Sequence, residues 1–313
     1  MAGTRFPLLY QINTRVWLTE LSAGLGRRAT LDDIPDAELD HLAELGFDWV
    51  WLLSVWQTGL AGQQVSRSNP GWQREFQETL PDLREEDIAG SGFAVTSYTV
   101  HTDLGGDAAL ARLRERLRQR GLRLMLDFVP NHTGLDHPWV QTHPEYFIEG
   151  TPDDLARQPH NYIRVASDNG EWILAHGRDP NFPGWPDTLQ LNYANPATQE
   201  AMIGELLKVA SQCDGVRCDM AMLLLPDVFE RTWGAAAAGI LAKGDRACPR
   251  AGARLRVHGR GLLGPGMDHA AAGLRLRVRQ AALRPAPRRT RPAGARASSR
   301  GPRIPEQARE VSG

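Results

Sequence analysis

The 313-residue sequence has few cysteines and no long apolar run. Its three cysteines, Cys213, Cys218 and Cys248, do not make a disulfide framework. Cys213 and Cys218 flank a strand-like run, so we expect buried thiols in a reducing compartment. No apolar run approaches the roughly 20 residues of a membrane span, so we expect no membrane partner. Residues 1–9 lack a basic region followed by an apolar core, so we expect no signal peptide and a cytoplasmic protein.

Glutamate is absent between Glu230 and Glu306, and Phe, Tyr and Trp are absent from residues 235–305. That stretch has no sustained helical or strand period, and its composition cannot bury much of an aromatic-lined core. Residues 235–313 carry 17 Lys+Arg against 4 Asp+Glu, a net charge of +13 in a chain of net charge −1. A basic arm ordinarily indicates nucleic-acid binding. This one lacks interleaved aromatics and has a single lysine, so we expect no nucleic-acid partner.

The first 234 residues alternate strand-like and helix-like segments, the pattern of βαβ units and a parallel sheet. A content of 42% hydrophobic and 23% charged residues is that of a soluble globular protein. Apolar runs predict buried strands at Tyr10–Leu18, Phe47–Leu53, Leu122–Val129 and Val216–Cys218. Capping residues and apolar stripes predict helices that begin near Asp36, Asp107 and the Asn195-Pro196 pair.

Two long segments interrupt this alternation, at residues 54–97 and 133–194. Each follows a predicted strand, and long loops at the carboxyl ends of strands are where a β/α barrel keeps its binding surface. Trp139 and Trp185 of the second segment either line that surface or pack within it. Trp51, on a predicted strand, is interpreted as a core residue.

Two predicted strands end in polar side chains, in the segments Asp127-Phe128-Val129-Pro130-Asn131-His132 and Gly215-Val216-Arg217-Cys218-Asp219. Buried strands that deliver chemistry at their carboxyl ends have this form in a β/α barrel. Because side chains alternate along a strand, Arg217 and Asp219 are expected on one face.

The two segments extend to DFVPNHTG (127–134) and DGVRCDMA (214–221). They resemble the first and second sequence regions of glycoside hydrolase family 13, the α-amylase family. Two further segments, Tyr10-Gln11-Ile12 and FDWVWL (47–52), resemble the first two barrel strands of that family. The resemblance implies an α/β fold, an incomplete (β/α)8 TIM barrel followed by an irregular tail. Residues 1–234 would hold about the first four β/α units and an insertion after the third strand, at about 133–194. Residues 235–313 would form the tail.

The resemblance also implies roles for individual residues in cleaving or transferring an α-glucan or α-glucoside with retention. Asp219 matches the catalytic nucleophile, and Arg217 matches the arginine that orients it and keeps it ionised. His132 matches a residue that hydrogen-bonds the sugar. Asp127 matches a buried carboxylate at the site, and a purely structural role for it stays open.

Two more residues match family positions with weaker patterns around them. Phe93 lies where many members carry a tyrosine that stacks on the sugar, so stacking is expected without the hydroxyl. Asn131 matches a residue that ligates calcium in many members, though not in all, and a structural turn is the alternative reading. The reaction itself requires no cofactor.

The sequence contains no motif for the carboxyl group that should act as acid and base. Retaining hydrolysis needs a second carboxyl about 5–5.5 Å from the nucleophile. The family supplies a glutamate some 30 residues after the nucleophile, with a His-Asp pair further along. His258 and Asp268 fall in this stretch, but neither has the family's motif around it.

The tail is compatible with a one-nucleotide frameshift. When the gene is read one nucleotide out of frame, the present amino-acid sequence fixes the first and third letters of each shifted codon and leaves only the middle letter free. The codons of residues 256–281 are then compatible with a peptide that contains MAEVYW, which resembles the family's third region. Its glutamate would be encoded across Arg260 and Gly261. We therefore hypothesise a frameshift between about Gly234 and Gly239, which reading the gene would test.

The sequence thus predicts a retaining α-glucosidase or glucanotransferase of carbohydrate metabolism, with this chain inactive because the acid is missing. A non-catalytic, sugar-binding or unstable fragment is the alternative.

Overall fold

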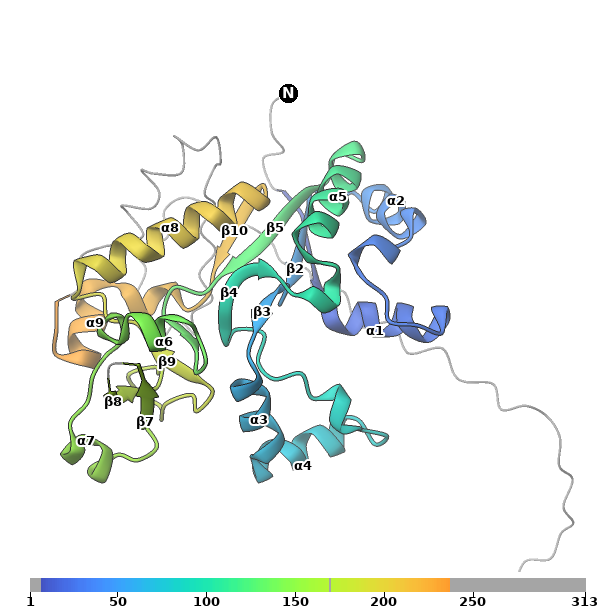
Figure 1. Ribbon diagram of the computed structural model, residues 1–313. Coiled ribbons are helices and arrows are strands. Elements are labelled where there is room, and N and C mark those ends of the chain that lie inside the picture. The colour runs from blue at the N-terminus through green and yellow to red at the C-terminus, as the bar shows by residue number, and fades with distance from the viewer. Residues whose placement is uncertain (1–6, 169, 237–313) are drawn as a thin grey trace, which may run out of the picture. The chain divides into compact units, whose positions relative to one another are not determined.

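The two motifs end neighbouring strands of a four-stranded parallel sheet (Figure 1). The structure is a computed structural model that describes residues 7–168 and 170–236, all within one unit of the chain, Met1–Gln280. The strands lie in the order β1 (Leu9–Asn13), β2 (Trp49–Leu53), β5 (Arg123–Phe128) and β10 (Gly215–Cys218). Buried residues run almost unbroken along β2, β5 and β10, as expected of a parallel sheet covered on both faces.

Helices follow these strands along the chain. They are α1 (Thr14–Leu25), α2 (Asp36–Glu44), α5 (Gly106–Gln119), α8 (Pro196–Gln212) and α9 (Pro226–Trp233). Both α5 and α8 contact β5, and α8 also contacts β10. The predicted apolar stripe of α5, formed by Leu110, Leu113 and Leu117, is buried in the main core. The alternation of parallel strands and covering helices confirms the α/β pattern read from the sequence.

Arginines on the outer side of α5 pair with carboxylates on and near α2. The pairs are Arg112 with Asp32, Arg116 with Asp36 and Arg120 with Asp40, at 2.6, 2.8 and 2.6 Å. Their partly exposed positions limit each to a small contribution to stability.

The predicted strand at Tyr10–Leu18 is wrong in its second half. The strand ends at Asn13, whose side-chain oxygen accepts a hydrogen bond from the backbone N–H of Val16 at 3.3 Å and caps α1. Val16 is 49% exposed, and Leu18 faces the core. The β-branched side chains suggested a strand, but a capped helix that buries Leu18 is formed instead.

The two long segments lie beyond the carboxyl ends of the sheet strands (Figure 1). Residues 54–97 contain β3 (Trp56–Thr58), α3 (Leu60–Ser68), α4 (Pro70–Thr79) and the first part of β4 (Val95–Val100), with β3 antiparallel to β4. Residues 133–194 include most of β6 (His132–Gly134), followed by α6 (Trp139–Thr142), α7 (Pro152–Arg157), β7 (Tyr162–Ser167), β8 (Gly170–Ala175) and β9 (Thr188–Gln190). In this segment β6 pairs with β9 and β7 with β8, both antiparallel.

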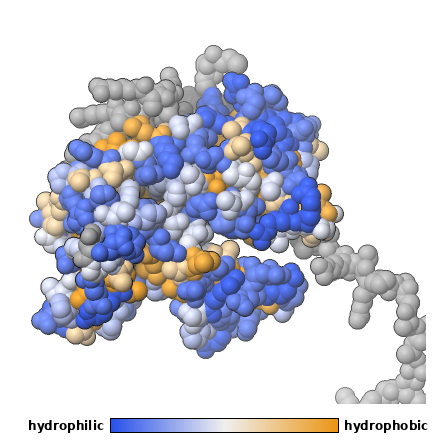
Figure 2. Space-filling model, viewed as in Figure 1, coloured by the Kyte–Doolittle hydropathy of each residue, from blue (hydrophilic) through white to orange (hydrophobic). Residues whose placement is uncertain are grey.

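The two segments touch each other, because Asp136 accepts a hydrogen bond from the backbone N–H of Ala61 at 3.1 Å. Figure 2 shows the surface notched between them, with apolar residues along the edge of the notch. Short 3₁₀ turns complete the described chain: η1 (Leu31–Asp33), η2 (Glu85–Asp87), η3 (Thr102–Leu104), η4 (Pro144–Tyr146) and η5 (Ala221–Leu224).

The remaining expectations concern cysteines, membranes and the tail. Cys213 and Cys218 are both buried, as expected, whereas Cys248 lies outside the described residues. Within the described ranges, no helix combines the length and apolar character needed to cross a membrane. The irregular tail was predicted for residues 235–313, and all of it except residues 235 and 236 lies outside the described residues, as does the peptide read in its other frame.

The cap of α8 gives a test of the fold. The Asn195 side chain accepts a hydrogen bond from the N–H of Ala197 at 2.9 Å. We expect Asn195→Ala to lower the free energy of unfolding by about 1 kcal/mol, measured by chemical denaturation. Asn195→Ser keeps a capping oxygen and should lose far less. Equal stability of the two variants would contradict this account of the helix start.

Candidate active site

Asp127, Arg217 and Asp219 meet at the carboxyl edge of the sheet. Arg217 on β10 lies directly opposite Asp127 on the neighbouring strand β5. Asp219 follows β10, and its backbone N–H donates to the carbonyl of Phe128 at 2.7 Å, which continues the strand pairing by one step. The two segments singled out in the sequence are therefore brought together by strand register.

One nitrogen of Arg217 serves both carboxylates. Its Nη1 lies 2.7 Å from Oδ1 of Asp219 and 3.1 Å from Oδ1 of Asp127. The three side chains are 5%, 9% and 3% exposed, in the order Arg217, Asp219, Asp127. A buried charge needs a partner of opposite sign, so this shared contact fixes all three groups. The expected placement of Arg217 and Asp219 on one face is confirmed.

Asp127 is also held by groups on and after β2. Its Oδ1 accepts from the indole Nε1–H of Trp51 at 3.2 Å, and its Oδ2 from the backbone N–H of Ser54 at 3.4 Å. Burial, with a smaller contribution from the charge of Asp219, raises the pKa of Asp127 to about 7, although Arg217 and Trp51 oppose the rise. Both oxygens of Asp127 are therefore engaged with the protein, which fits a supporting role in the site.

His132 is the first residue of β6 and is buried, with 4% of its surface exposed. Its ring lies 5.2 Å from the ring of Trp185, measured between centroids. Burial lowers the pKa of His132 to about 4, so the imidazole is neutral at neutral pH and offers one donor and one acceptor. Trp139, the other loop tryptophan, packs instead against His137 and Tyr146.

Asn131 is tied into an amide pair with Gln190. The Nδ2–H of Asn131 donates to Oε1 of Gln190 at 3.1 Å, and Nε2–H of Gln190 donates back to the backbone carbonyl of Asn131 at 2.9 Å. Among residues 7–168 and 170–236, no group of three or more His, Cys, Asp or Glu side chains is placed to hold a metal ion. Calcium at Asn131 stays a prediction; Oδ1 of Asn131, the oxygen that would ligate it, accepts a hydrogen bond from Nε2–H of Gln190 at 3.3 Å.

Phe93 lies against Arg217, with its ring centroid 5.3 Å from the guanidinium carbon Cζ. Trp51 approaches the same carbon at 5.0 Å. The sequence placed Phe93 at the site through a family position, whereas Trp51 was interpreted only as core packing. The contacts of Trp51 with Asp127 and Arg217 join residues far apart in the chain, so no local sequence pattern indicates them.

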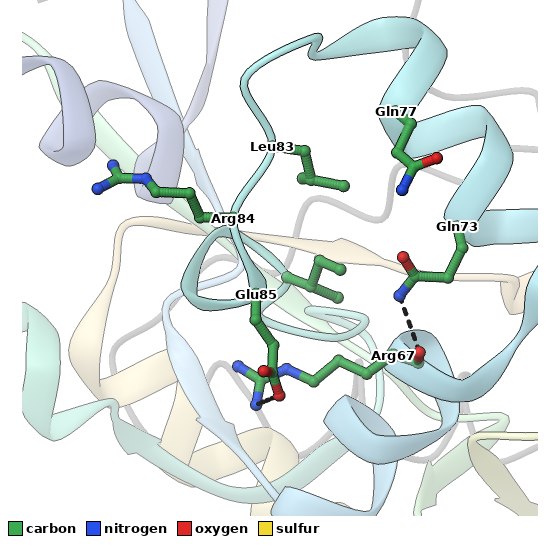
Figure 3. Close-up of a pocket in the computed structure, with 7 residues that line it drawn as sticks. Arg67, Gln73, Gln77, Leu83, Arg84 and Glu85 are labelled. Carbon is green, nitrogen blue, oxygen red and sulfur yellow. Dashed lines mark hydrogen bonds and ion pairs between the residues drawn. The ribbon is translucent and has the colours of Figure 1, made fainter.

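A polar hollow of about 360 Å³ lies elsewhere, between α3, α4 and the segment after α4 (Figure 3). Gln73, Gln77 and Leu83 line it, together with Arg67, which is paired with Glu85 at 3.1 Å. None of the predicted site residues lines this hollow. The chemistry expected from the sequence therefore belongs to the sheet edge.

Comparison with known proteins gives a family match. The family model described as "Alpha amylase, catalytic domain" matches residues 30–238, about two thirds of the chain. The salivary α-glucosidase of Aedes aegypti is 26% identical over 205 residues, which cover 62% of this chain and 30% of that protein. A trehalose synthase/amylase of Mycobacterium tuberculosis is 25% identical over 243 residues, covering 72% and 34%.

Solved structures agree on the fold. The isomaltulose synthase of Klebsiella sp. LX3 superimposes with a TM-score of 0.52 at 17% identity, covering 83% of this chain and 45% of that one. This likeness to a (β/α)8 barrel confirms the incomplete barrel predicted from the sequence. The chain spans about a third of the length of the curated relatives it matches.

Asp127 and Asp219 both contact the Arg217 guanidinium, so the pKa of Asp127 depends on this arrangement and can test it. We expect its carboxyl carbon to titrate near pH 7 in ¹³C NMR. Asp219→Asn should lower this pKa, because it removes a like charge and leaves Arg217 to Asp127 alone.

The same shift has a consequence for stability. The pKa of Asp127 is higher in the folded protein than its value of about 3.9 in the unfolded chain. The resulting contribution to the free energy of unfolding is fully present below about pH 3.9. The contribution is lost as pH rises through about 7. A midpoint near pH 4 in the folded protein would contradict the burial and pairing described here.

Proposed function

The chain belongs to the α-amylase catalytic-domain family, and from that membership we propose that it carries the nucleophile half of a retaining active site for α-glucosides. The observation that carries the proposal is the Asp219 carboxylate, held by Arg217 at 2.7 Å at the carboxyl edge of the sheet. Carboxyl edges of barrel strands are where such folds place their chemistry.

The proposed reaction begins at the Asp219 carboxylate. Nη1 of Arg217 lies 2.7 Å from Oδ1, so we assign the attack to Oδ2. Oδ2 attacks the anomeric carbon, the bond from that carbon to the leaving oxygen breaks, and a glycosyl ester forms. The departing oxygen takes the bonding pair and a proton from water. Water or a sugar hydroxyl then attacks the anomeric carbon, breaks its bond to Asp219, releases a proton to solvent and restores the carboxylate.

His132 and Trp185 support binding of the sugar in this scheme. A neutral, buried imidazole can donate one hydrogen bond to a sugar hydroxyl without the cost of a buried charge. The ring of Trp185 limits the movement of that imidazole by lying against it. Donors fixed before binding cost less to order when the substrate arrives.

The substrate class follows from the family and not from the geometry alone. Relatives are named as α-glucosidase and trehalose synthase/amylase, and a structural neighbour as isomaltulose synthase. Those names cover both hydrolysis and transfer, which share a carboxylate nucleophile. We propose an α-glucan or small α-glucoside as the substrate.

The lack of an acid to protonate the leaving oxygen limits the activity of this chain. Asp127 is a poor candidate, because Arg217, Trp51 and Ser54 engage its two oxygens. No glutamate occurs between Glu230 and Glu306. General acid catalysis typically contributes 10²–10⁴-fold, so turnover of ordinary glucosides should be slow by about that factor.

A non-catalytic sugar-binding protein or unstable fragment is the second candidate, and the same missing glutamate favours it. The two candidates differ in the reactivity of Asp219. Binding of maltooligosaccharides without any covalent chemistry at that carboxylate would support the second.

A substrate with a fluoride leaving group separates them, because fluoride departs without a proton from the enzyme. We expect 5-fluoro-α-D-glucosyl fluoride to lose fluoride and form an ester with Asp219, detected by intact mass spectrometry and peptide mapping. Asp219→Asn should abolish the added mass, and Asp168→Asn, at an exposed turn, should leave it unchanged. No added mass on a folded sample would contradict the proposed function.

We propose that the missing acid is encoded in the other frame of the gene. The nucleotide sequence should spell MAEVYW in the shifted frame across the codons of residues 258–264. Protein made in that frame should hydrolyse maltooligosaccharides about 10²–10⁴ times faster than the present chain. A shifted frame that does not encode this glutamate would overturn the frameshift and leave the fluoride experiment unaffected.

A further inference from the structure

The Arg217 guanidinium lies over two aromatic rings. Its carbon Cζ lies over the ring of Trp51 at 5.0 Å and over the ring of Phe93 at 5.3 Å. Both distances fall within the roughly 6 Å over which a cation is attracted to an aromatic face. We call these two residues the Trp51–Phe93 pair.

The rings and the carboxylates use different parts of the guanidinium. A guanidinium donates hydrogen bonds in its plane, and Nη1 donates one to Asp127 at 3.1 Å and forms an ion pair with Asp219 at 2.7 Å. Its faces carry no donors and suit aromatic stacking. Two carboxylates that share one nitrogen do not fix the tilt of the plane by themselves. The two rings are the further groups placed close enough to restrain that tilt.

The two rings come from different parts of the chain. Trp51 is on β2, inside the sheet, and is 7% exposed. Phe93 is near the end of the 54–97 segment, two residues before β4, and is partly buried against the main core. The long segment thus returns to the sheet edge and places a ring on the residue that orients Asp219.

We propose that Phe93 is a positioning residue that fixes the plane of Arg217, and through it the carboxylate of Asp219, rather than a platform for the sugar. Trp51 acts on the same guanidinium and also holds Asp127 through its indole N–H. The inference rests on the proposed function, since it concerns the geometry of the attacking carboxylate.

The two roles make different kinetic predictions. A ring that stacks on sugar contributes to binding, so its loss raises the concentration needed for half-maximal reaction. A ring that orients the nucleophile contributes at the reacting centre, so its loss lowers the maximal rate and leaves that concentration unchanged.

Labelling with 5-fluoro-α-D-glucosyl fluoride, measured at a series of concentrations, gives both quantities. We expect Phe93→Leu to lower the maximal labelling rate by ~10-fold, the size of a partly desolvated cation–π contact, with an unchanged half-saturation concentration. Phe93→Tyr keeps the ring and should restore the rate. Phe76→Leu, a half-buried phenylalanine of α4 in the same segment, is the matched control and should behave as the unmodified chain.

Two labelling results would overturn the proposal. One is a higher half-saturation concentration at an unchanged maximal rate for Phe93→Leu, as a sugar platform requires. The other is labelling by Phe93→Leu that matches the unmodified chain in both quantities.

A measurement without turnover keeps the inference separate from the proposed function. NMR of arginine side chains reports rotation about the Nε–Cζ bond, and the Arg217 signal is assigned by its loss in Arg217→Lys. We expect slow rotation in the unmodified chain and at least severalfold faster rotation in Phe93→Leu, with slow rotation retained in Phe93→Tyr and Phe76→Leu. Unchanged rotation in Phe93→Leu would overturn the positioning role. Absence of labelling in the unmodified chain would overturn only the proposed function.

Discussion

A single buried guanidinium organises the sheet edge of this protein. Arg217 is 5% exposed, and removing its charge from water carries a cost that only close partners offset. Two carboxylates, one on β5 and one directly after β10, provide those partners through one nitrogen. The register of β5 and β10, the burial of Asp127 and the direction of the Asp219 side chain together place both carboxylates on that charge.

The long segments after the strands complete this arrangement. One brings Phe93 onto Arg217, and the other brings Trp185 onto His132. They also meet each other through Asp136 and Ala61. The sheet therefore supplies rigid positions for charged groups, and the loops supply aromatic surfaces that restrain them. Charged groups on a rigid sheet, restrained by aromatic rings from the loops, suit a site in which a carboxylate attacks a neutral sugar.

Much of this was predictable from the sequence, for identifiable reasons. Asp127 and Asp219 end buried strands, and alternation along β10 put Arg217 beside Asp219 on one face. The end of β1 was misjudged, because the Asn13 cap overrode the strand preference of the residues that follow. The role of Trp51 and the Asn131–Gln190 pair were missed, because each joins residues more than 50 positions apart. Contacts of that kind arise from packing and leave no local pattern.

A double-mutant cycle on the free energy of unfolding tests most directly whether the two carboxylates share one guanidinium. Asp127→Asn and Asp219→Asn each leave Arg217 with one carboxylate, so each alone should be tolerated. The double variant leaves a buried, unpaired guanidinium, which costs about 3–5 kcal/mol. The account predicts that the double variant loses at least ~1 kcal/mol more than the two single losses combined. Losses that add within about 0.5 kcal/mol, as for independent sites, would contradict it.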